Sequence, residues 1–162
     1  MSQKVRFYVV HFILGLVLIV FQSTLLAKLG GLDFLPVLVI HLGAGSAFIS
    51  SAIVILLLGL AQDLFSGAMT GLHSCLYLLI FFGAYLINRA VHLGETFQRM
   101  AAVCVALVLL HLVLSQAVGG GHSSGRQWLN IGVTTIVSPF LFQLFSLAES
   151  WQLRIMQIRS VD

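Results

Sequence analysis

Long apolar runs, separated by short polar or glycine-rich groups, dominate the hydropathy pattern of this chain. A transmembrane helix needs about 20 mostly apolar residues. The runs that come close to this length lie at residues 7–26, 72–88, 100–118 and 129–147. The first run follows Lys4 and Arg6, is too long for the apolar core of a signal peptide and precedes no clear cleavage site. We therefore predict a retained first transmembrane helix.

The apolar segment at residues 34–65 is too long for a single span. As one helix it would measure roughly 48 Å, against an apolar bilayer core of about 30 Å. Ser50 and Ser51 lie at its centre and predict a break there. We expect two short helices, at residues 34–49 and 51–64, which either thin the bilayer locally or lie inside the bundle.

The distribution of basic residues favours six spans over five. With six spans and a cytoplasmic N-terminus, the inner segments hold six Lys and Arg residues, and the outer loops hold only Lys28 and Arg126. The best five-span arrangement gives five against three. By the positive-inside rule, the sequence predicts an all-α membrane protein. We expect residues 1–162 to form a single domain, one bundle of six transmembrane helices with both termini in the cytoplasm.

Composition supports lipid as the solvent of this chain. Hydrophobic residues make up 59% of it and charged residues only 8%, with a mean hydropathy of +1.07. A soluble domain carries about 25% charged residues. The net charge of +3 comes from few residues, which act as topology signals and do not form a nucleic-acid patch. Cys75 and Cys104 lie in apolar runs, and we interpret them as small buried hydrophobic residues.

Asp63 is the most informative polar residue. It is the only acidic residue between Asp33 and Glu95, and a charge at membrane depth costs about 2.5–3.5 kcal/mol. We predict it near the outer end of the third span, where the negative end of the helix dipole disfavours an aspartate. Compensating partners are therefore expected. Lys28 and Arg126 are predicted on the same side of the membrane, and Gln62 and His73 are nearby in sequence.

Several interpretations of Asp63 remain open at the level of sequence. It could cap the turn before Thr70 at the water interface, or it could be a packed and partnered aspartate that fixes the bundle or a partner contact. A proton relay is a third hypothesis. The surrounding Gly59, Gly67 and Gly71 recur at short intervals. We expect close helix packing at Gly59 and turn geometry at the other two.

Other polar residues fall within the predicted spans. Four of the six histidines do so: His11, His41, His73 and His111. A haem between His41 and His111 is one hypothesis, but we favour ordinary interhelical hydrogen bonds. Gln22, Gln62, Gln116 and Gln143 are expected to bond across helices. We expect no metal, no cofactor and no catalysis, since the sequence holds no recognisable catalytic constellation.

The order of several short motifs resembles the MreD family of bacterial rod shape-determining membrane proteins. The matching positions are Phe21-Gln22, Pro36, Gly59-x-x-x-Asp63-Leu-x-Ser-Gly67-x-x-x-Gly71, Asn130-x-Gly132-Val133 and Pro139-Phe140. The resemblance as a whole extends over roughly residues 7–147. Two departures are Val37 after Pro36, where the family commonly has Asp or Asn, and the glycine-rich stretch at residues 119–125.

The resemblance implies a non-enzymatic subunit of the cell-elongation machinery in the bacterial cytoplasmic (inner) membrane. Its architecture would be similar to the membrane substrate-binding components of energy-coupling-factor transporters. Its implied partner is MreC, and through MreC the cytoskeletal MreB and the peptidoglycan synthases, besides membrane lipid. Gln62, Asp63 and the glycines around them, with Pro36, Asn130 and Pro139, are the expected packing or partner-binding residues.

The alternative function is small-molecule binding by the membrane component of a vitamin-type transporter. Such a protein needs a pocket of polar and aromatic side chains near the outer face. Gln62, His73, Trp128 and Asn130 could supply one. An ion or proton channel ranks last, since nothing in the sequence sets a selectivity filter.

Overall fold

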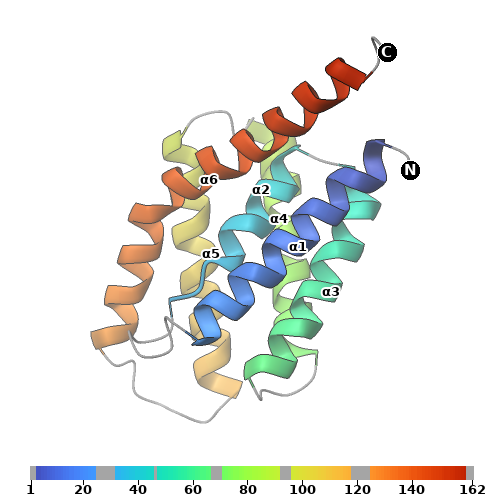
Figure 1. Cartoon of the computed structure of the whole chain (residues 1–162). Helices are drawn as coiled ribbons and strands as arrows, with labels where there is room; N and C mark the ends of the chain where they lie inside the picture. The colour runs from blue at the N-terminus through green and yellow to red at the C-terminus, as the bar shows by residue number, and fades with distance from the viewer. Residues whose placement is uncertain are drawn as a thin grey trace.

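The computed structural model describes residues 3–24, 32–45, 47–66, 71–91, 96–117 and 125–159, and all of their regular structure is helical. The helices are α1 (Gln3–Thr24), α2 (Leu35–Gly45), α3 (Phe48–Ser66), α4 (Leu72–Val91), α5 (Thr96–Ala117) and α6 (Gly125–Arg159). Successive helices run in opposite directions, so the start of α1 and the end of α6 lie at the same end of the bundle (Figure 1).

The lengths of these helices agree with a membrane protein. Four are long and apolar enough to cross a bilayer, through their segments Phe7–Thr24, Phe48–Ser66, Leu72–Arg89 and Trp128–Leu147. Shorter apolar helices occupy Leu35–Gly45 and Gln98–Leu114. The predicted all-α membrane fold is therefore confirmed at this level, whereas six complete spans with cytoplasmic termini stay a prediction.

The division of the 34–65 segment differs from the expected one. α2 ends at Gly45 and α3 begins at Phe48, so Ser50 and Ser51 lie inside the first turn of α3 and the predicted break there is wrong. Gly45 closes α2, whereas Ser51 is fully buried and fits within α3. As a result α3 has 19 residues, near full length, and α2 only 11.

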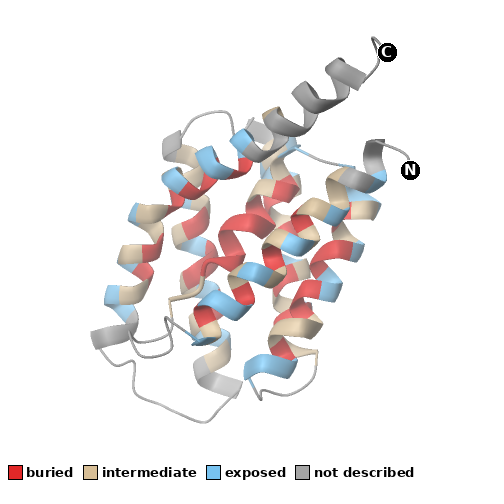
Figure 2. Cartoon of the chain, in the orientation of Figure 1, coloured by how far each residue is buried: buried red, intermediate tan, exposed pale blue. Residues whose placement is uncertain are grey.

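The short α2 lies in the centre of the bundle, which agrees with the expectation that a short helix in this segment lies inside the bundle. At 1.5 Å per residue it measures about 16 Å, too short to cross the apolar core of a bilayer. Its residues from Leu35 to Ile40 are all buried, and it contacts every other helix. Figure 2 shows this concentration of buried residues on α2 behind α1. A helix that is apolar on all sides is stable only when enclosed in this way.

The outward faces of the longer helices are apolar too. Large side chains such as Ile13, Leu79 and Ile136 are more than half exposed. In water such a surface would aggregate, but in a bilayer it faces lipid tails. Cys75 also lies on an exposed face of α4, so its predicted burial is wrong, while Cys104 is partly buried.

Prolines mark one helix start and one helix interior. Pro36 is the second residue of α2, and the Asp33 carboxylate accepts a hydrogen bond from the Leu35 backbone N–H just before it, at 3.2 Å. This combination of a side-chain cap and an early proline is a common helix start. Pro139 instead lies inside α6 and cannot donate to the Thr135 carbonyl. The Ser138 hydroxyl donates to that carbonyl at 2.8 Å, so it stays satisfied.

Close approach of α3 and α4 depends on Gly59. A methyl group at this position would lie 2.8 Å from the Ser74 backbone nitrogen and closer still to its Cα. These two helices form the most extensive helix pair of the bundle. The absence of a side chain at Gly59 therefore sets their separation.

We predict that Gly59→Ala destabilises the protein by about 1–3 kcal/mol, because α3 and α4 would have to separate. Gly83→Ala is the matched control, since a methyl group on this helical glycine of α4 meets no atom within 4 Å. The control should be neutral or stabilising by up to about 1 kcal/mol, from helix propensity. Thermal unfolding in detergent measures both, and equal behaviour of the two variants would contradict the packing role of Gly59.

Candidate functional site: a buried aspartate and a polar cavity

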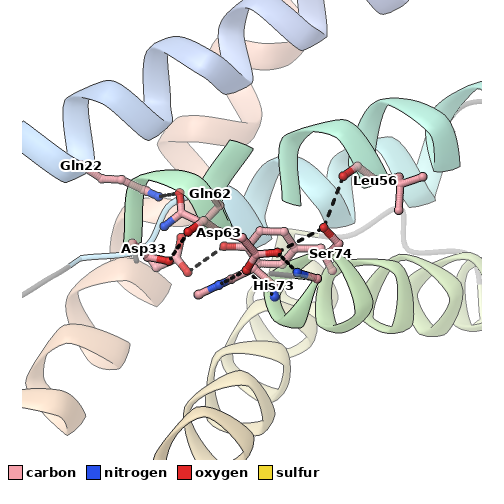
Figure 3. Close-up of polar contacts among 10 residues, drawn as sticks. Gln22, Asp33, Leu56, Gln62, Asp63, His73 and Ser74 are labelled. Carbon is pink, nitrogen blue, oxygen red and sulfur yellow. Dashed lines mark hydrogen bonds and ion pairs between the residues drawn. The ribbon is translucent and has the colours of Figure 1, made fainter. Parts of the chain in front are cut away.

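Asp63 lies in the last turn of α3, and its carboxylate points at the first turn of α4 (Figure 3). The residue is only 2% exposed. Its Oδ1 accepts the His73 backbone N–H at 2.9 Å and bonds to His73 Nδ1 at 2.8 Å. Its Oδ2 accepts the Gly71 backbone N–H at 2.7 Å and the Ser74 hydroxyl at 3.4 Å. Both oxygens of the carboxylate are therefore fully used.

This arrangement resolves the electrostatic problem that the sequence raised. Asp63 is at the unfavourable end of α3, but it caps the N-terminus of α4, where free backbone N–H groups and the helix dipole attract an anion. Gly71 supplies its N–H from a left-handed conformation, with φ of +96°, that favours glycine. Of the expected partners, His73 bonds to Asp63, whereas Lys28 and Arg126 lie outside the residues whose side chains the structure describes, as does Gly67.

The contact with Asp63 also sets the orientation of the His73 ring. A carboxylate only accepts hydrogen bonds, so Nδ1 of His73 carries the proton that is shared with Asp63. In the neutral ring, Nε2 is then an acceptor. His73 is buried, so this acceptor is held in one place.

A second polar group joins α1, the segment before α2, and α3. Gln22 Nε2 donates to Gln62 Oε1 at 3.0 Å, and Gln22 Oε1 accepts the Phe34 backbone N–H at 3.1 Å (Figure 3). This confirms the expected interhelical bond for two of the glutamines. Gln143 is exposed, and the side chain of Gln116 is outside the described part of the chain.

Asp33 connects this group to α4. Its Oδ2 accepts the Tyr77 hydroxyl at 3.2 Å, and Tyr77 is fully buried. Burial raises the pKa of the Asp33 carboxyl, and the hydrogen bonds from Leu35 and Tyr77 only partly oppose this. The carboxyl is thus in a region where an uncompensated charge is unfavourable.

A cavity of about 470 Å³ lies beside these groups, at the end of the bundle where α3 turns into α4. Its polar wall includes Gln22, Asp33, Gln62, His73, His111, Asn130 and Thr134. Gln62, His73 and Asn130 were expected to line a pocket, and the structure brings them together. Trp128, the fourth residue of that expectation, does not line the cavity and is 52% exposed.

Three residues of the site were not predicted from the sequence: Asp33, Tyr77 and Thr134. Asp33 shortly before Pro36 is a helix-start signal, and Tyr77 follows His73 by four residues, which places both on one face of α4. Thr134 carried no such signal. Pro36 and Pro139 lie outside the cavity wall, so the predicted site residues do not form one cluster.

The intramembrane histidines do not pair as the haem hypothesis required. His41 stacks on His11, with ring centroids 6.0 Å apart, and packs beside Phe145. His111 lines the cavity instead. Among the described residues, no group of three or more His, Cys, Asp or Glu side chains could hold a metal ion.

Comparison with known proteins gives no relative. No family model, no curated protein and no solved structure matches this chain. The function is therefore inferred from the motifs of the sequence and the geometry of the molecule.

We predict that Asp63→Ala strongly destabilises the protein. The change leaves the Gly71 and His73 N–H groups without their acceptor, at about 1–3 kcal/mol for each buried donor. Loss of folded protein in detergent, measured by size-exclusion yield and thermal unfolding, is the expected result. Leu64→Ala, at the adjacent and 78% exposed position, is the control and should behave like the unmodified protein. An Asp63→Ala protein of full stability would contradict the capping role.

Proposed function

We propose that this protein is a non-enzymatic membrane subunit of the cell-elongation complex, of the MreD type, which binds the transmembrane helix of an MreC-type partner. Through that partner it would connect to MreB and the peptidoglycan synthases, in the bacterial inner membrane with both termini cytoplasmic. The motif resemblance suggests the family. The main support for a binding role is an apolar groove between α4 and α5.

The groove exists because α4 and α5 both pack on α2 but have little contact with each other. It has a volume of about 380 Å³, and Ile40 of α2 forms part of its wall. Its α4 and α5 walls are rich in small residues: Gly83, Ala84, Ala101, Ala102 and Ala106. Small side chains let a second helix approach closely, which drives helix association in lipid.

One polar atom distinguishes this groove from a surface suited only to lipid tails. Gln98 also lines it, and its Oε1 is buried without a hydrogen-bond partner within the described structure. An acyl chain cannot satisfy this oxygen, and an unsatisfied polar group in hydrocarbon is costly. A Ser, Thr or amide side chain on a partner helix could donate to it. The groove therefore favours a helix as its occupant.

We predict that Gly83→Leu prevents co-purification of a co-expressed MreC-type single-span protein from the same genome. The leucine would fill the groove without disturbing the fold, because a Cβ at Gly83 meets nothing within 4 Å. Gly132→Leu is the matched control, as this glycine of α6 is equally open but lies outside the groove. Pull-down in mild detergent should recover the partner at one-to-one stoichiometry with the control. With Gly83→Leu the recovery should fall at least about tenfold, which corresponds to a loss of more than about 1.4 kcal/mol in binding free energy.

Retention of the partner by a folded Gly83→Leu protein would exclude the groove as the binding surface. Failure of the unmodified protein to retain the partner would refute the proposed function itself. Recovery of an ATPase module on the inner loops would instead support the alternative, a transporter component.

A further inference from the structure

The polar cavity contains hydrogen-bonding groups that the fold itself does not use. Thr134 is only 1% exposed and lines the cavity, yet its hydroxyl has no hydrogen-bond partner among the described residues. His73 is 6% exposed, and only its Nδ1 is engaged. The buried Nε2 of His111 also has no partner in the described structure. Buried polar groups are normally satisfied, so these atoms indicate an occupant.

Gln62 adds a donor to this set. Its Oε1 accepts from Gln22, whereas its Nε2 bonds to no described residue. The cavity wall thus offers at least one free amide donor, one hydroxyl and two imidazole nitrogens. Such a combination orients a small polar molecule rather than a lipid tail.

Charge selects among polar molecules. Asp33 is the only carboxylate on the described cavity wall, and no Lys or Arg belongs to that wall. Its oxygens interact with the donors of Leu35, Tyr77 and Gln22, but a carboxylate has about four acceptor positions and so retains capacity for one further donor. Asp63 lies behind His73 and has no capacity left, since four donors surround it.

We propose that this cavity binds a small organic cation, an ammonium group paired with Asp33 and a hydroxyl or amide that bonds to Thr134 and the free His73 nitrogen. The cation compensates a carboxylate that burial otherwise disfavours. Water would satisfy single atoms, whereas an ammonium group also supplies a counter-charge to Asp33. The inference does not depend on the binding of a partner helix, because the groove and the cavity share no lining residue.

The test uses three probes of one length: 4-amino-1-butanol, 1,4-butanediol and 4-hydroxybutyrate. These are cationic, neutral and anionic, and each carries a terminal hydroxyl. Saturation-transfer NMR on the full chain in detergent measures their binding. We expect millimolar affinity for the amine, typical of so small a ligand, and at least about tenfold weaker binding of the diol and the anion, because a charge-assisted hydrogen bond is lost.

Two variants locate the binding site. Asp33→Asn removes the charge but keeps a side chain that can cap α2, and it should weaken amine binding about tenfold or more. Thr134→Val removes a hydroxyl without breaking any described hydrogen bond, so it should weaken binding with no loss of thermal stability. Thr135→Val is the control, because the Thr135 hydroxyl already donates to the Ile131 carbonyl at 2.8 Å and does not line the cavity.

Several results would overturn the proposal. They are equal or stronger binding of the diol or the anion, no binding of any probe, and amine binding that Thr134→Val leaves unchanged. The Thr134 variant keeps the test decisive if Asp33→Asn proves unstable, since no described contact of the fold depends on this hydroxyl. Selective amine binding that both variants reduce would support it.

Discussion

The rest of the site depends on one interaction, the buried Asp63 carboxylate at the N-terminus of α4. Four hydrogen bonds from Gly71, His73 and Ser74 satisfy it. In lipid these groups have no water as an alternative partner, so the contact fixes how α3 turns into α4. The same turn brings Ser74 against Gly59, and a side chain there would keep the two helices apart. Electrostatics and close packing therefore specify one geometry, and the His73 imidazole is oriented as a result.

The enclosed helix α2 imposes the second constraint. It is too short to span a bilayer by itself, and it is stable because the other helices surround it. The backbone N–H groups at its start still need hydrogen-bond acceptors. Asp33 accepts from the N–H of Leu35, and Gln22 accepts from the N–H of Phe34. These groups then contact Gln62 and Tyr77 on α3 and α4. A polar layer at one end of an otherwise apolar bundle thus follows from the burial of α2, and the cavity forms inside that layer.

Much of the fold was predictable, because long apolar runs and helix-start signals are local properties of the sequence. The helical class and the start of the second helix near residue 34 both follow from such signals. The break near residue 46 was misplaced because two serines suggested a polar interruption, whereas Ser51 is buried within α3. The backbone partners of Asp63, the N–H groups of Gly71 and His73, were not predicted for a different reason. A sequence pattern does not show which backbone groups of the next helix are free to donate, so only side chains such as Lys28, Arg126 and His73 could be named. Thr134 joins the cavity only through tertiary packing, which no local pattern encodes.

The groove and the cavity have no lining residue in common, but one helix contributes residues to both. α5 lines both, with Ala102 and Ala106 facing the groove and Leu107 and His111 facing the cavity. It packs mainly on α6 and has little contact with α4. A displacement of α5 relative to its neighbours would therefore change the groove and the cavity together, because this helix contributes wall residues to both.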